Sequence, residues 1–479
     1  MMFASDFAAI VPILCVIAAG IACLLAEALR QPGEQMPIGG LAAIGLAGAG
    51  TTAALLWGRN AIGFGVITAD SFALFVVLVL VAIGLLTVLF SPALIARDEL
   101  PAGEYYALVL FGLAGMMLMA MATDLLVIFL ALEVLSLAVY VLTAIRRQAI
   151  GAEAGFKYFL LGAFSSAFFL YGIAFAFGVS GSTKLDRLGS VVAAEAMNQS
   201  PLALVALGLL LVGFAFKVSA VPFHMWTPDA YEGAPTLVAG FMSTAVKAAA
   251  FAAFTRVFLS ALEPLRPSWA PALWAIAAAT MILGTVVGVA QTNLKRMLAY
   301  SSIAHAGYLL VALVAANDVG KSAVLFYLLV YGVGNLGAFA TIALLGTRDH
   351  ANDDLDSFAG LSARHPAIAA AMAVFLLSLG GLPPTAGFVG KWYVFSAAVQ
   401  SGYYGLAVIG VLTSIVSIFF YLRVIVMMYM APPAEVPAPA APSRIAVAAL
   451  AASVLITFYL GVLPGRVVEL ASRSVATIF

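Results

Sequence analysis

The chain of 479 residues is 64% hydrophobic and only 9% charged, and its formal net charge at pH 7 is zero. A soluble domain carries about 25% charged residues, so this composition excludes a soluble globular protein, and the balanced charge excludes a basic nucleic-acid surface. The two cysteines, Cys15 and Cys23, form no CxxC or Cys/His cluster, which argues against a zinc site or an iron–sulfur cluster.

Apolar runs of about 18–25 residues recur along almost the whole chain, each long enough to cross a hydrocarbon core of roughly 30 Å. The runs are continuously apolar rather than alternating, so they predict an all-α polytopic membrane protein and exclude a β-barrel. The first run has no basic segment before it, which favours an uncleaved helix over a signal peptide. About fourteen transmembrane helices are expected, at 7–26, 37–57, 72–95, 106–122, 124–145, 155–179, 201–221, 235–259, 269–290, 297–316, 321–346, 366–399, 403–430 and 443–463.

Two of the predicted spans contain residues that interrupt a helix. Prolines occur in KVSAVPFHMWTPDAYEGAP, which begins at Lys217, and glycines and prolines occur in SLGGLPPTAGFVGKW, which contains Lys391. Broken helices at corresponding places in two halves indicate an internal repeat with ion sites near mid-membrane. We therefore expect helices 4–8 and 9–13 to form two inverted five-helix repeats, each with one broken helix.

This pattern divides the chain into four parts. They are an N-terminal three-helix segment at 1–105, a first repeat at 106–259, a second repeat at 269–430, and a linker with a C-terminal helix at 431–479. The linker, APPAEVPAPAAP, is expected to run extended along the surface. The basic pairs Arg146–Arg147 and Lys295–Arg296 fall on one side, which predicts that this side is cytoplasmic and that both termini are periplasmic.

Ionisable residues inside the apolar runs are the candidate functional sites. Five of them lie within or at the ends of predicted spans. They are one glutamate, Glu133, and four of the seven lysines, Lys157, Lys217, Lys247 and Lys391. A charge near the bilayer centre costs roughly 2.5–3.5 kcal/mol on insertion scales, so this pattern predicts an intramembrane ion or proton path. Glu133 and Lys217 can each stabilise the charge of the other, although a static ion pair that only fixes helix packing is the alternative.

Lys247, His305 and Lys391 extend the candidate path. Lys247 shares its span with no acidic residue, so it should exchange a proton readily; the alternative is a lysine that reaches the membrane interface. His305 lies among serines and a tyrosine, which suits a hydrated path, but a lone histidine in a helix can also be a hydrogen-bonded core residue. Lys391 stands beside the second break, where free backbone carbonyls can hold water.

Three further residues are secondary candidates. Lys157 lies one turn into its helix and can equally be a membrane-edge lysine, while His224 and Asp229 lie in the first broken segment, where Asp229 can simply cap a helix. His224 and His305 have no partner at helical spacing, which argues against a haem. The segment GFVGKW lacks the Walker spacing, so no nucleotide-binding loop is predicted.

The segments KVSAVPFHMWTPDAYEGAP and QTNLKRMLAYSSIAHAGYLL resemble the two signature regions of the antiporter-like membrane subunits of respiratory complex I, the NADH:quinone oxidoreductase. The resemblance covers the fourteen-helix layout, both broken helices, and the positions of Glu133 and Lys217. Three large subunits of this kind are known. The largest has a long C-terminal lateral helix, which is not expected in this chain, and the second has a glutamate where this chain has Lys391. The chain therefore resembles the third. The likeness extends to Mrp-type cation/proton antiporters and membrane hydrogenases.

This resemblance implies a non-redox subunit of a translocase that moves protons, coupled to quinone reduction elsewhere in the complex. It implies that Glu133 and Lys217 form a coupling pair, Lys247 and His305 a central relay, and Lys391 a terminal site. It implies no cofactor on this chain, with NADH, FMN, iron–sulfur clusters and quinone on other subunits. The expected partners are neighbouring antiporter-like and small membrane subunits of complex I, and lipid, in a bacterial inner membrane. A stand-alone Mrp-like cation/proton antiporter and a purely structural subunit are the rival functions.

Overall fold

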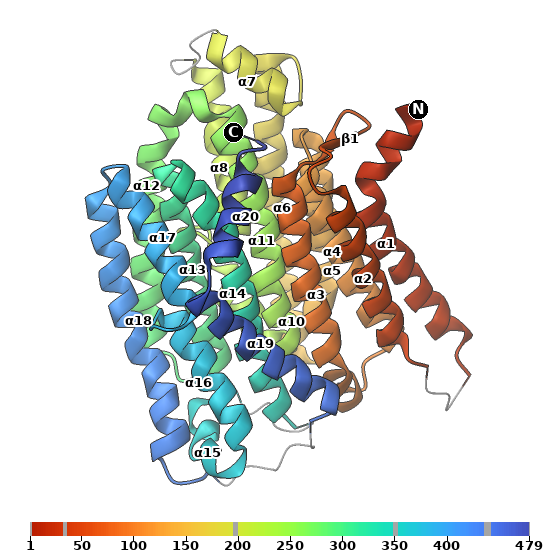
Figure 1. Ribbon diagram of the computed structural model, residues 1–479, viewed down its shortest axis with the longest axis vertical. Coiled ribbons are helices and arrows are strands. Elements are labelled where there is room, and N and C mark those ends of the chain that lie inside the picture. Colours follow the sequence, from red (N-terminus) through yellow and green to blue (C-terminus); the bar gives the residue numbers. More distant parts are fainter. Residues whose placement is uncertain (1, 32–35, 195–199, 348–352, 435–441, 479) are drawn as a thin grey trace.

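A computed structural model describes residues 2–31, 36–194, 200–347, 353–434 and 442–478. These residues form a bundle of long helices that run side by side (Figure 1). The helices of the first part are α1 (Met2–Leu29), α2 (Ile38–Leu56), α3 (Ser71–Asp98), α4 (Ala102–Met121), α5 (Leu125–Ala144), α6 (Ala149–Ser180), α7 (Leu185–Ala194), α8 (Pro201–Lys217), α9 (Trp226–Gly233), α10 (Thr236–Phe241) and α11 (Lys247–Arg256). Those of the second part are α12 (Arg266–Val289), α13 (Leu294–Ala315), α14 (Asp318–Leu345), α15 (Leu361–Arg364), α16 (Pro366–Gly380), α17 (Ala386–Gln400), α18 (Tyr404–Met430), α19 (Arg444–Val462) and α20 (Gly465–Val475).

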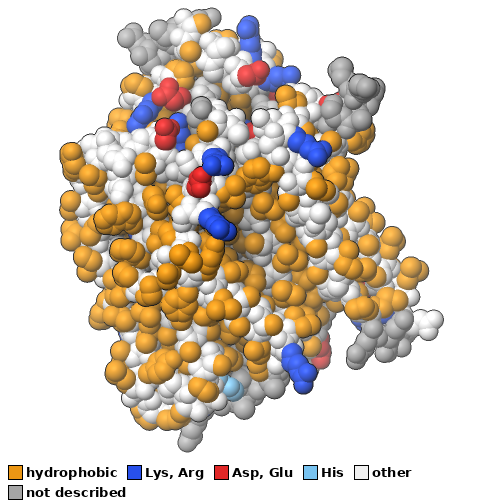
Figure 2. Space-filling view, viewed as in Figure 1, with side chains coloured by type: hydrophobic (Ala, Val, Ile, Leu, Met, Phe, Trp, Pro, Cys, Tyr) orange, Lys and Arg blue, Asp and Glu red, His pale blue; other side chains and the backbone are white. Residues whose placement is uncertain are grey.

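The helices account for the apolar runs of the sequence. Twelve helical segments among the described residues are long and apolar enough to cross a membrane, and two shorter apolar helices, α8 and α16, accompany them. Hydrophobic side chains cover the middle and lower parts of one face, whereas most charged side chains on it lie in the upper part (Figure 2). The chain is thus a polytopic helical membrane protein, while the count of fourteen spans and the inverted repeats stay predictions.

Several short elements lie outside the predicted spans. The strands β1 (Ala61–Gly63) and β2 (Ile67–Ala69) form an antiparallel hairpin with Ile62 opposite Thr68, which is a small exception within the predicted helical fold. Helix α7 occupies a predicted loop, and α20 follows α19 where one terminal helix was expected. Hydropathy detects only long apolar runs, so it misses such elements. The centre of the Pro/Ala-rich linker, 435–441, and Asn352 of the acidic loop lie outside the described residues.

Both predicted helix breaks are present. Helix α8 ends at Lys217, and an irregular segment that includes Pro222 precedes α9. Helix α16 ends at Gly380, where Gly381 adopts a left-handed φ of 82°, and α17 begins only at Ala386. Proline removes a backbone donor and clashes with the preceding turn, and glycine accepts the left-handed conformation without strain, so these residues end the helices where the sequence predicts.

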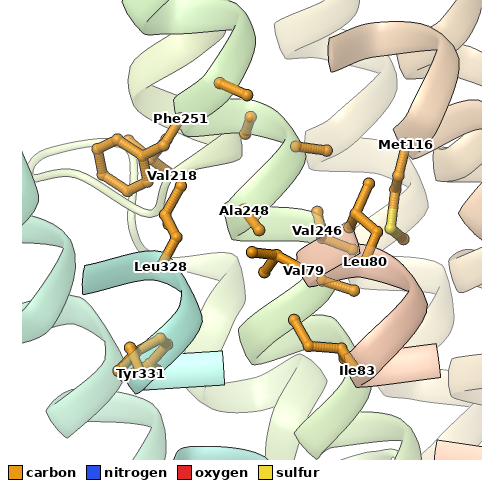
Figure 3. Packing of buried hydrophobic residues seen from close by; sticks show 14 of the residues in the cluster. Val79, Leu80, Ile83, Met116, Val218, Val246, Ala248, Phe251, Leu328 and Tyr331 are labelled. Carbon is orange, nitrogen blue, oxygen red and sulfur yellow. The ribbon is translucent and has the colours of Figure 1, made fainter. Parts of the chain in front are cut away.

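The segment that carries Lys247 lies at the centre of the bundle. Helices α10 and α11 join through a π-helical turn, η2 (Met242–Val246), and a second such turn, η3 (Val257–Ala261), follows α11. The apolar window of this segment is entirely buried, compared with 28% of the corresponding window in α2. Figure 3 shows Val246 and Phe251 of this segment packed among side chains of α3, α4 and α14. Any polar group on the segment must therefore find its partners within the protein.

A buried ion pair fixes the end of this central segment to α3. Arg256, at the end of α11, donates to both carboxylate oxygens of Asp70 at 2.8 and 3.0 Å. Asp70 also caps α3 by accepting from the backbone N–H of Ala73 at 2.7 Å. The Arg256 guanidinium lies 5.3 Å from the centre of the Phe72 ring. The bidentate contact, the cap and the aromatic face together compensate for burying the two charges.

Removing one partner of this pair should destabilise the protein strongly. Arg256→Met leaves the Asp70 charge buried without its counter-ion, and such a loss costs about 3–5 kcal/mol. We expect a matching fall in the thermal midpoint of the detergent-purified complex. Combining Arg256→Met with Asp70→Asn, which keeps a capping side chain, should recover most of the loss. Equal stability of the single and double variants would show that the pair contributes no coupling.

Candidate functional site

Lys217 is held by oxygen and aromatic rings at the end of α8. Its side chain is only 2% exposed, and its Nζ donates to the Ser136 hydroxyl of α5 at 2.6 Å. The ring centres of Tyr140 and Tyr158 lie 5.7 and 5.8 Å from the same nitrogen. The Ser136 hydroxyl in turn donates to the carbonyl of Leu132. The amine thus meets one hydroxyl and two π faces, which attract a cation.

Glu133 lies on α5 one turn before Ser136 and is partly buried. Its carboxylate accepts from the Ser166 hydroxyl of α6 at 2.5 Å. In the part of the chain that the structure describes, no ion pair joins Glu133 to Lys217 and each of them bonds to a serine, so their role as a coupling pair stays a prediction. Ser136 provides the oxygen that the Lys217 amine contacts. Glu133 lies on the outer face of α5, which it shares with the exposed Leu130 and Leu137. The two charges still interact electrostatically.

Lys247 is the first residue of α11 and is 1% exposed. Its Nζ donates to the Ser302 carbonyl at 2.6 Å and to the Ser302 hydroxyl at 2.5 Å, both on α13. No acidic side chain among the described residues forms an ion pair with it. The alternative of a lysine that reaches the membrane interface is excluded, because the amine points into the bundle.

His305 is held between two tyrosines. Its Nδ1 lies 2.7 Å from the Tyr327 hydroxyl and its Nε2 lies 3.3 Å from the Tyr421 hydroxyl. The Tyr421 hydroxyl also bonds to the Ser301 hydroxyl. The predicted polar setting is confirmed, although the two hydrogen-bonding tyrosines come from other helices. Both ring nitrogens are engaged, so His305 offers none to a haem iron.

Lys391 lies on α17 and is 5% exposed. Its Nζ donates to the Gly380 carbonyl at 2.9 Å and to the Ser414 hydroxyl of α18 at 2.7 Å. The Gly380 carbonyl is free for this bond because α16 ends there, so the broken helix supplies the amine with an acceptor directly. The ring centre of Tyr308 lies 5.0 Å from the same nitrogen, and this ring makes an edge contact with His305 at 5.4 Å.

These contacts form one polar line through the second half of the bundle. Ser301, Ser302, His305 and Tyr308 follow one another on α13 at spacings of one, three and three residues, so they share one face of the helix. Ser302 of that face contacts Lys247 at one end, and the Tyr308 ring lies 5.0 Å from the Lys391 amine at the other. Hydroxyl groups both accept and donate, so such a line can pass protons between amines.

Two tyrosines occupy the space between Lys217 and Lys247. Tyr158 stacks on Trp226 at 4.3 Å between ring centres, and Tyr231 meets the same ring edge-on at 6.0 Å. Tyr231 also lies near Ser302, the partner of Lys247. The hydroxyls of both tyrosines are buried and make no hydrogen bond to any described residue.

A buried amide supports the turn that precedes Lys247. Asn335 of α14 is fully buried and donates to the Ser243 hydroxyl at 2.7 Å and to the Tyr331 hydroxyl at 2.9 Å. Ser243 lies in the π-helical turn η2, and the Tyr331 ring lies 5.0 Å from His305. Asn335 is not among the predicted site residues, although an asparagine within a long apolar run is a sequence signal of a polar site.

A single serine or tyrosine in an apolar run says little alone, so the sequence does not single out most of the hydroxyls and aromatic rings that surround the relay residues. They are Ser136, Ser166, Tyr140, Tyr158, Tyr231, Tyr327, Tyr421 and Ser414, whereas Ser302 was expected beside His305 and not beside Lys247.

The secondary candidates lie apart from the polar line. The side chain of Lys157 is 45% exposed and forms ion pairs with Glu153 at 2.8 Å and with Asp229 at 3.1 Å. Asp229 also pairs with Arg296 at 3.1 Å, and the N-terminus of α9 shows no side-chain cap. This exposed network favours a membrane-edge lysine. His224 precedes α9, and its Nδ1 is buried with no partner among the described residues.

The described residues contain no group of three His, Cys, Asp or Glu side chains that could hold a metal ion. The polar line is therefore built from amines, hydroxyls, one imidazole and backbone carbonyls.

The chain is similar to proteins of one known family over most of its length. The family model described as "NADH:quinone oxidoreductase/Mrp antiporter, TM" matches residues 122–417. The NADH-quinone oxidoreductase subunit N of Trichlorobacter lovleyi is 44% identical over 96% of this chain and 95% of its own length, and that of Chloroflexus aggregans is 42% identical over 99% and 98%. The chain belongs to the NADH-quinone oxidoreductase subunit N family. The resemblance to the antiporter-like subunits of complex I is thereby confirmed.

Solved structures agree with membership in the subunit N family. A chain of respiratory complex I from Thermus thermophilus with bound aureothin is 38% identical, with a TM-score of 0.83 over 96% of this chain and 99% of that chain. A chain of the Mrp complex from Dietzia sp. is 20% identical, with a TM-score of 0.82 over 99% and 97%, which shows a shared fold alone. The partners of a subunit N are the other membrane subunits of complex I.

The contact between Lys247 and Ser302 can be tested separately. Ser302→Ala removes a hydrogen bond to a charged group, which is worth about 1.5–3 kcal/mol, so NADH-driven proton pumping in membrane vesicles should slow by about tenfold or more. Ser302→Thr keeps the hydroxyl and should retain most of the rate. Ser322→Ala is the matched control, because the Ser322 hydroxyl bonds only to backbone of its own helix. Normal pumping by Ser302→Ala would exclude this hydroxyl from the path.

Proposed function

We propose that the chain translocates protons across the membrane through Glu133, Lys217, Lys247, His305 and Lys391, as a subunit of NADH:quinone oxidoreductase. The observation that carries this proposal is a repeated contact. Lys217, Lys247 and Lys391 each donate to a serine hydroxyl on another helix, at 2.5–2.7 Å, whereas the equally buried Lys295 donates to backbone carbonyls and pairs with Asp353. A purely structural lysine needs only an acceptor, whereas a hydroxyl can also return a proton.

The transfer step is a hydroxyl-mediated exchange. A protonated lysine gives its proton to the oxygen beside it, the hydroxyl releases its own proton to the next acceptor, and the amine becomes neutral. No heavy atom moves between residues, and each hydroxyl regains one proton for each it loses. His305 can take a proton on one ring nitrogen and release one from the other, since both nitrogens contact tyrosine hydroxyls.

Glu133 supplies the electrostatic control. It lies towards the outer face of α5 and still interacts with the Lys217 charge. Displacement of this carboxylate towards a neighbouring subunit removes a stabilising negative charge, so Lys217 releases its proton more readily. Moving one charge against about 150 mV requires roughly 3.5 kcal/mol, and the loss of one close counter-charge in the membrane interior is of that size.

The chain takes no part in the redox chemistry on this proposal. It binds no cofactor, and NADH, FMN, iron–sulfur clusters and quinone are carried by other subunits of the complex. The absence of a nucleotide-binding loop in the sequence supports this division of labour. The positive charges at Arg146–Arg147 and Lys295–Arg296 support a bacterial inner-membrane orientation with both termini periplasmic.

The rival functions fit less well. A stand-alone cation/proton antiporter needs acidic ligands for the cation, and the buried polar line described above contains no carboxylate. Identity over the full length of subunit N chains also favours complex I over the Mrp complex. A scaffold that conducts nothing would tolerate apolar residues at the buried lysines.

Replacing Lys217 tests the proposal directly. In inverted membrane vesicles, Lys217→Ala should lower NADH oxidation and vesicle acidification together, by at least about tenfold, because the relay loses its first amine. Both rates are recorded on one preparation, with the content of assembled complex measured alongside.

Lys184→Ala is the control, since Lys184 is exposed and directly precedes α7, away from the polar line. Wild-type oxidation and acidification with Lys217→Ala, in an assembled complex, would leave only a structural role for the lysine.

A further inference from the structure

A groove opens at the end of the bundle where α1 and α3 end and where α2 and α4 begin. It has a volume of about 730 Å³, within the range of roughly 300–1,000 Å³ of pockets that hold small molecules. Its wall also includes Ile445 of α19, which begins beside the lower end of α3 (Figure 1). Arg146 bonds to Asp98 at this end of α3, so the groove lies at the end that the basic pairs predict to be cytoplasmic. None of its lining residues belongs to the relay proposed above.

Most of the groove is apolar and follows α3 into the bundle. Val88 lies ten residues before Asp98 on this helix, so the groove reaches about 15 Å from the helix end towards the membrane centre. A hydrocarbon chain is the ligand that such a wall favours, because it needs no hydrogen bonds. The apolar side chains that line this part are Val88, Leu89, Pro92, Ile95 and Ala96 of α3 and Ala43 of α2.

The other end of the groove is polar and lies at the N-terminus of α2. Pro37 at the cap position gives no side-chain hydrogen bond, and the first turn contains Gly39 and Gly40, which both line the groove. The N–H of Gly39 makes no hydrogen bond to a described residue. The first N–H groups of a helix carry a partial positive charge and bind anions such as phosphate, and glycine leaves these groups uncovered.

The Tyr106 hydroxyl lies at the same helix terminus. Tyr106 is near the start of α4, is only 3% exposed and lines the groove. A Cβ atom at Gly39 would lie 2.8 Å from its hydroxyl oxygen, so the hydroxyl and the first turn of α2 are neighbours. Among the described residues the hydroxyl has no hydrogen-bond partner. A buried donor without a partner costs free energy, so this position favours a ligand that accepts a hydrogen bond.

Arg30 supplies a positive charge at the rim of the groove. It follows α1, and its side chain is 39% exposed. The Glu27 carboxylate lies 3.3 Å from one guanidinium nitrogen and also accepts from the backbone N–H of Gly103 at 2.9 Å. A guanidinium has five N–H donors in a plane that matches phosphate, so Arg30 can hold Glu27 and a second anion together.

We propose that this groove binds an anionic phospholipid. The phosphate lies between the N-terminus of α2, the Tyr106 hydroxyl and Arg30, and one acyl chain lies along α3 as far as Val88. The polar groups lie at helix ends, where the headgroups of a membrane are, and the apolar wall lies at the depth of the hydrocarbon. The site does not depend on the relay, because binding a lipid needs no proton transfer.

The charges at the polar end favour a headgroup that is negative overall. Glu27 is the carboxylate that neighbours Arg30, and the Gly103 N–H already shares it. The N-terminus of α2 and the guanidinium are both positive, and anionic lipids are attracted to such positive groups at the membrane surface. A zwitterionic headgroup such as phosphatidylcholine adds a cation that finds no further partner here.

Photo-crosslinking of the assembled complex tests the site. The complex is reconstituted in phosphatidylcholine nanodiscs that contain a small fraction of a probe lipid with a diazirine on its acyl chain. The probe is either phosphatidylglycerol or phosphatidylcholine, and labelled peptides are mapped by mass spectrometry. We expect the phosphatidylglycerol probe to label the α3 wall around Leu89 about fivefold more than the phosphatidylcholine probe, and excess unlabelled phosphatidylglycerol to abolish the difference. Equal labelling by the two probes, or no label on this wall, would overturn the proposal.

Two variants test the polar end. Arg30→Gln and Tyr106→Phe each remove a hydrogen bond to the phosphate, so each should lower phosphatidylglycerol labelling of the α3 wall by about fivefold or more and leave phosphatidylcholine labelling unchanged. NADH oxidation should stay at the wild-type rate in both, which shows that the complex is assembled. Arg59→Gln is the matched control and should keep full labelling, because Arg59 is an exposed arginine beyond the opposite end of α2. Full labelling of both test variants would exclude a headgroup at this end.

Other occupants of the groove give different results. If inorganic phosphate alone removes the preference for phosphatidylglycerol, the polar end binds a soluble anion. If neither probe labels the α3 wall, another subunit covers the groove in the complex. Either result overturns the lipid site and leaves the proton relay as it stands.

Discussion

The structure depends on one constraint, which is that the hydrocarbon interior offers no water to a charged or polar group. Each buried amine must therefore find its oxygen partners on neighbouring helices. Lys217, Lys247 and Lys391 all do so through a serine hydroxyl, and two of them add a backbone carbonyl. These bonds require close and fixed helix spacing. The packing of the helices therefore sets the geometry of the polar line.

The helix breaks follow from the same constraint. Irregular backbone is tolerated at membrane depth only where protein or a polar cavity satisfies its free groups. At the second break, the Gly380 carbonyl accepts from Lys391, and at the first, the Phe216 carbonyl accepts from the Trp226 indole at 3.0 Å. Proline and glycine thus create acceptors as well as ending helices. The carbonyl at the first break, that of Phe216, binds an aromatic side chain, and the carbonyl at the second break, that of Gly380, binds an ionisable one.

A shared fold is not evidence of a shared function. An Mrp complex chain at 20% identity has nearly the same arrangement of helices, so the fold alone does not distinguish an antiporter from a complex I subunit. The chain's place in the subunit N family comes from identity over its full length. What the chain does is argued from the polar line, in which amines alternate with hydroxyls and an imidazole, and from a carboxylate on the outer face that a neighbouring subunit can influence.

The sequence by itself determined the class of protein, the helices, both breaks and the ionisable residues, because each of these depends on local composition or on the cost of one buried charge. It also singled out His305 and the buried Lys217, Lys247 and Lys391. Only the tertiary structure decided their partners: Ser136 rather than Glu133 at Lys217, and Tyr327 and Tyr421 at His305. Such contacts join residues between 22 and 116 positions apart, and they depend on the rotation and spacing of whole helices, which a one-dimensional pattern does not fix. The sequence did not predict the hairpin or α20 for a related reason, because short elements at the surface are stabilised by the residues against which they pack.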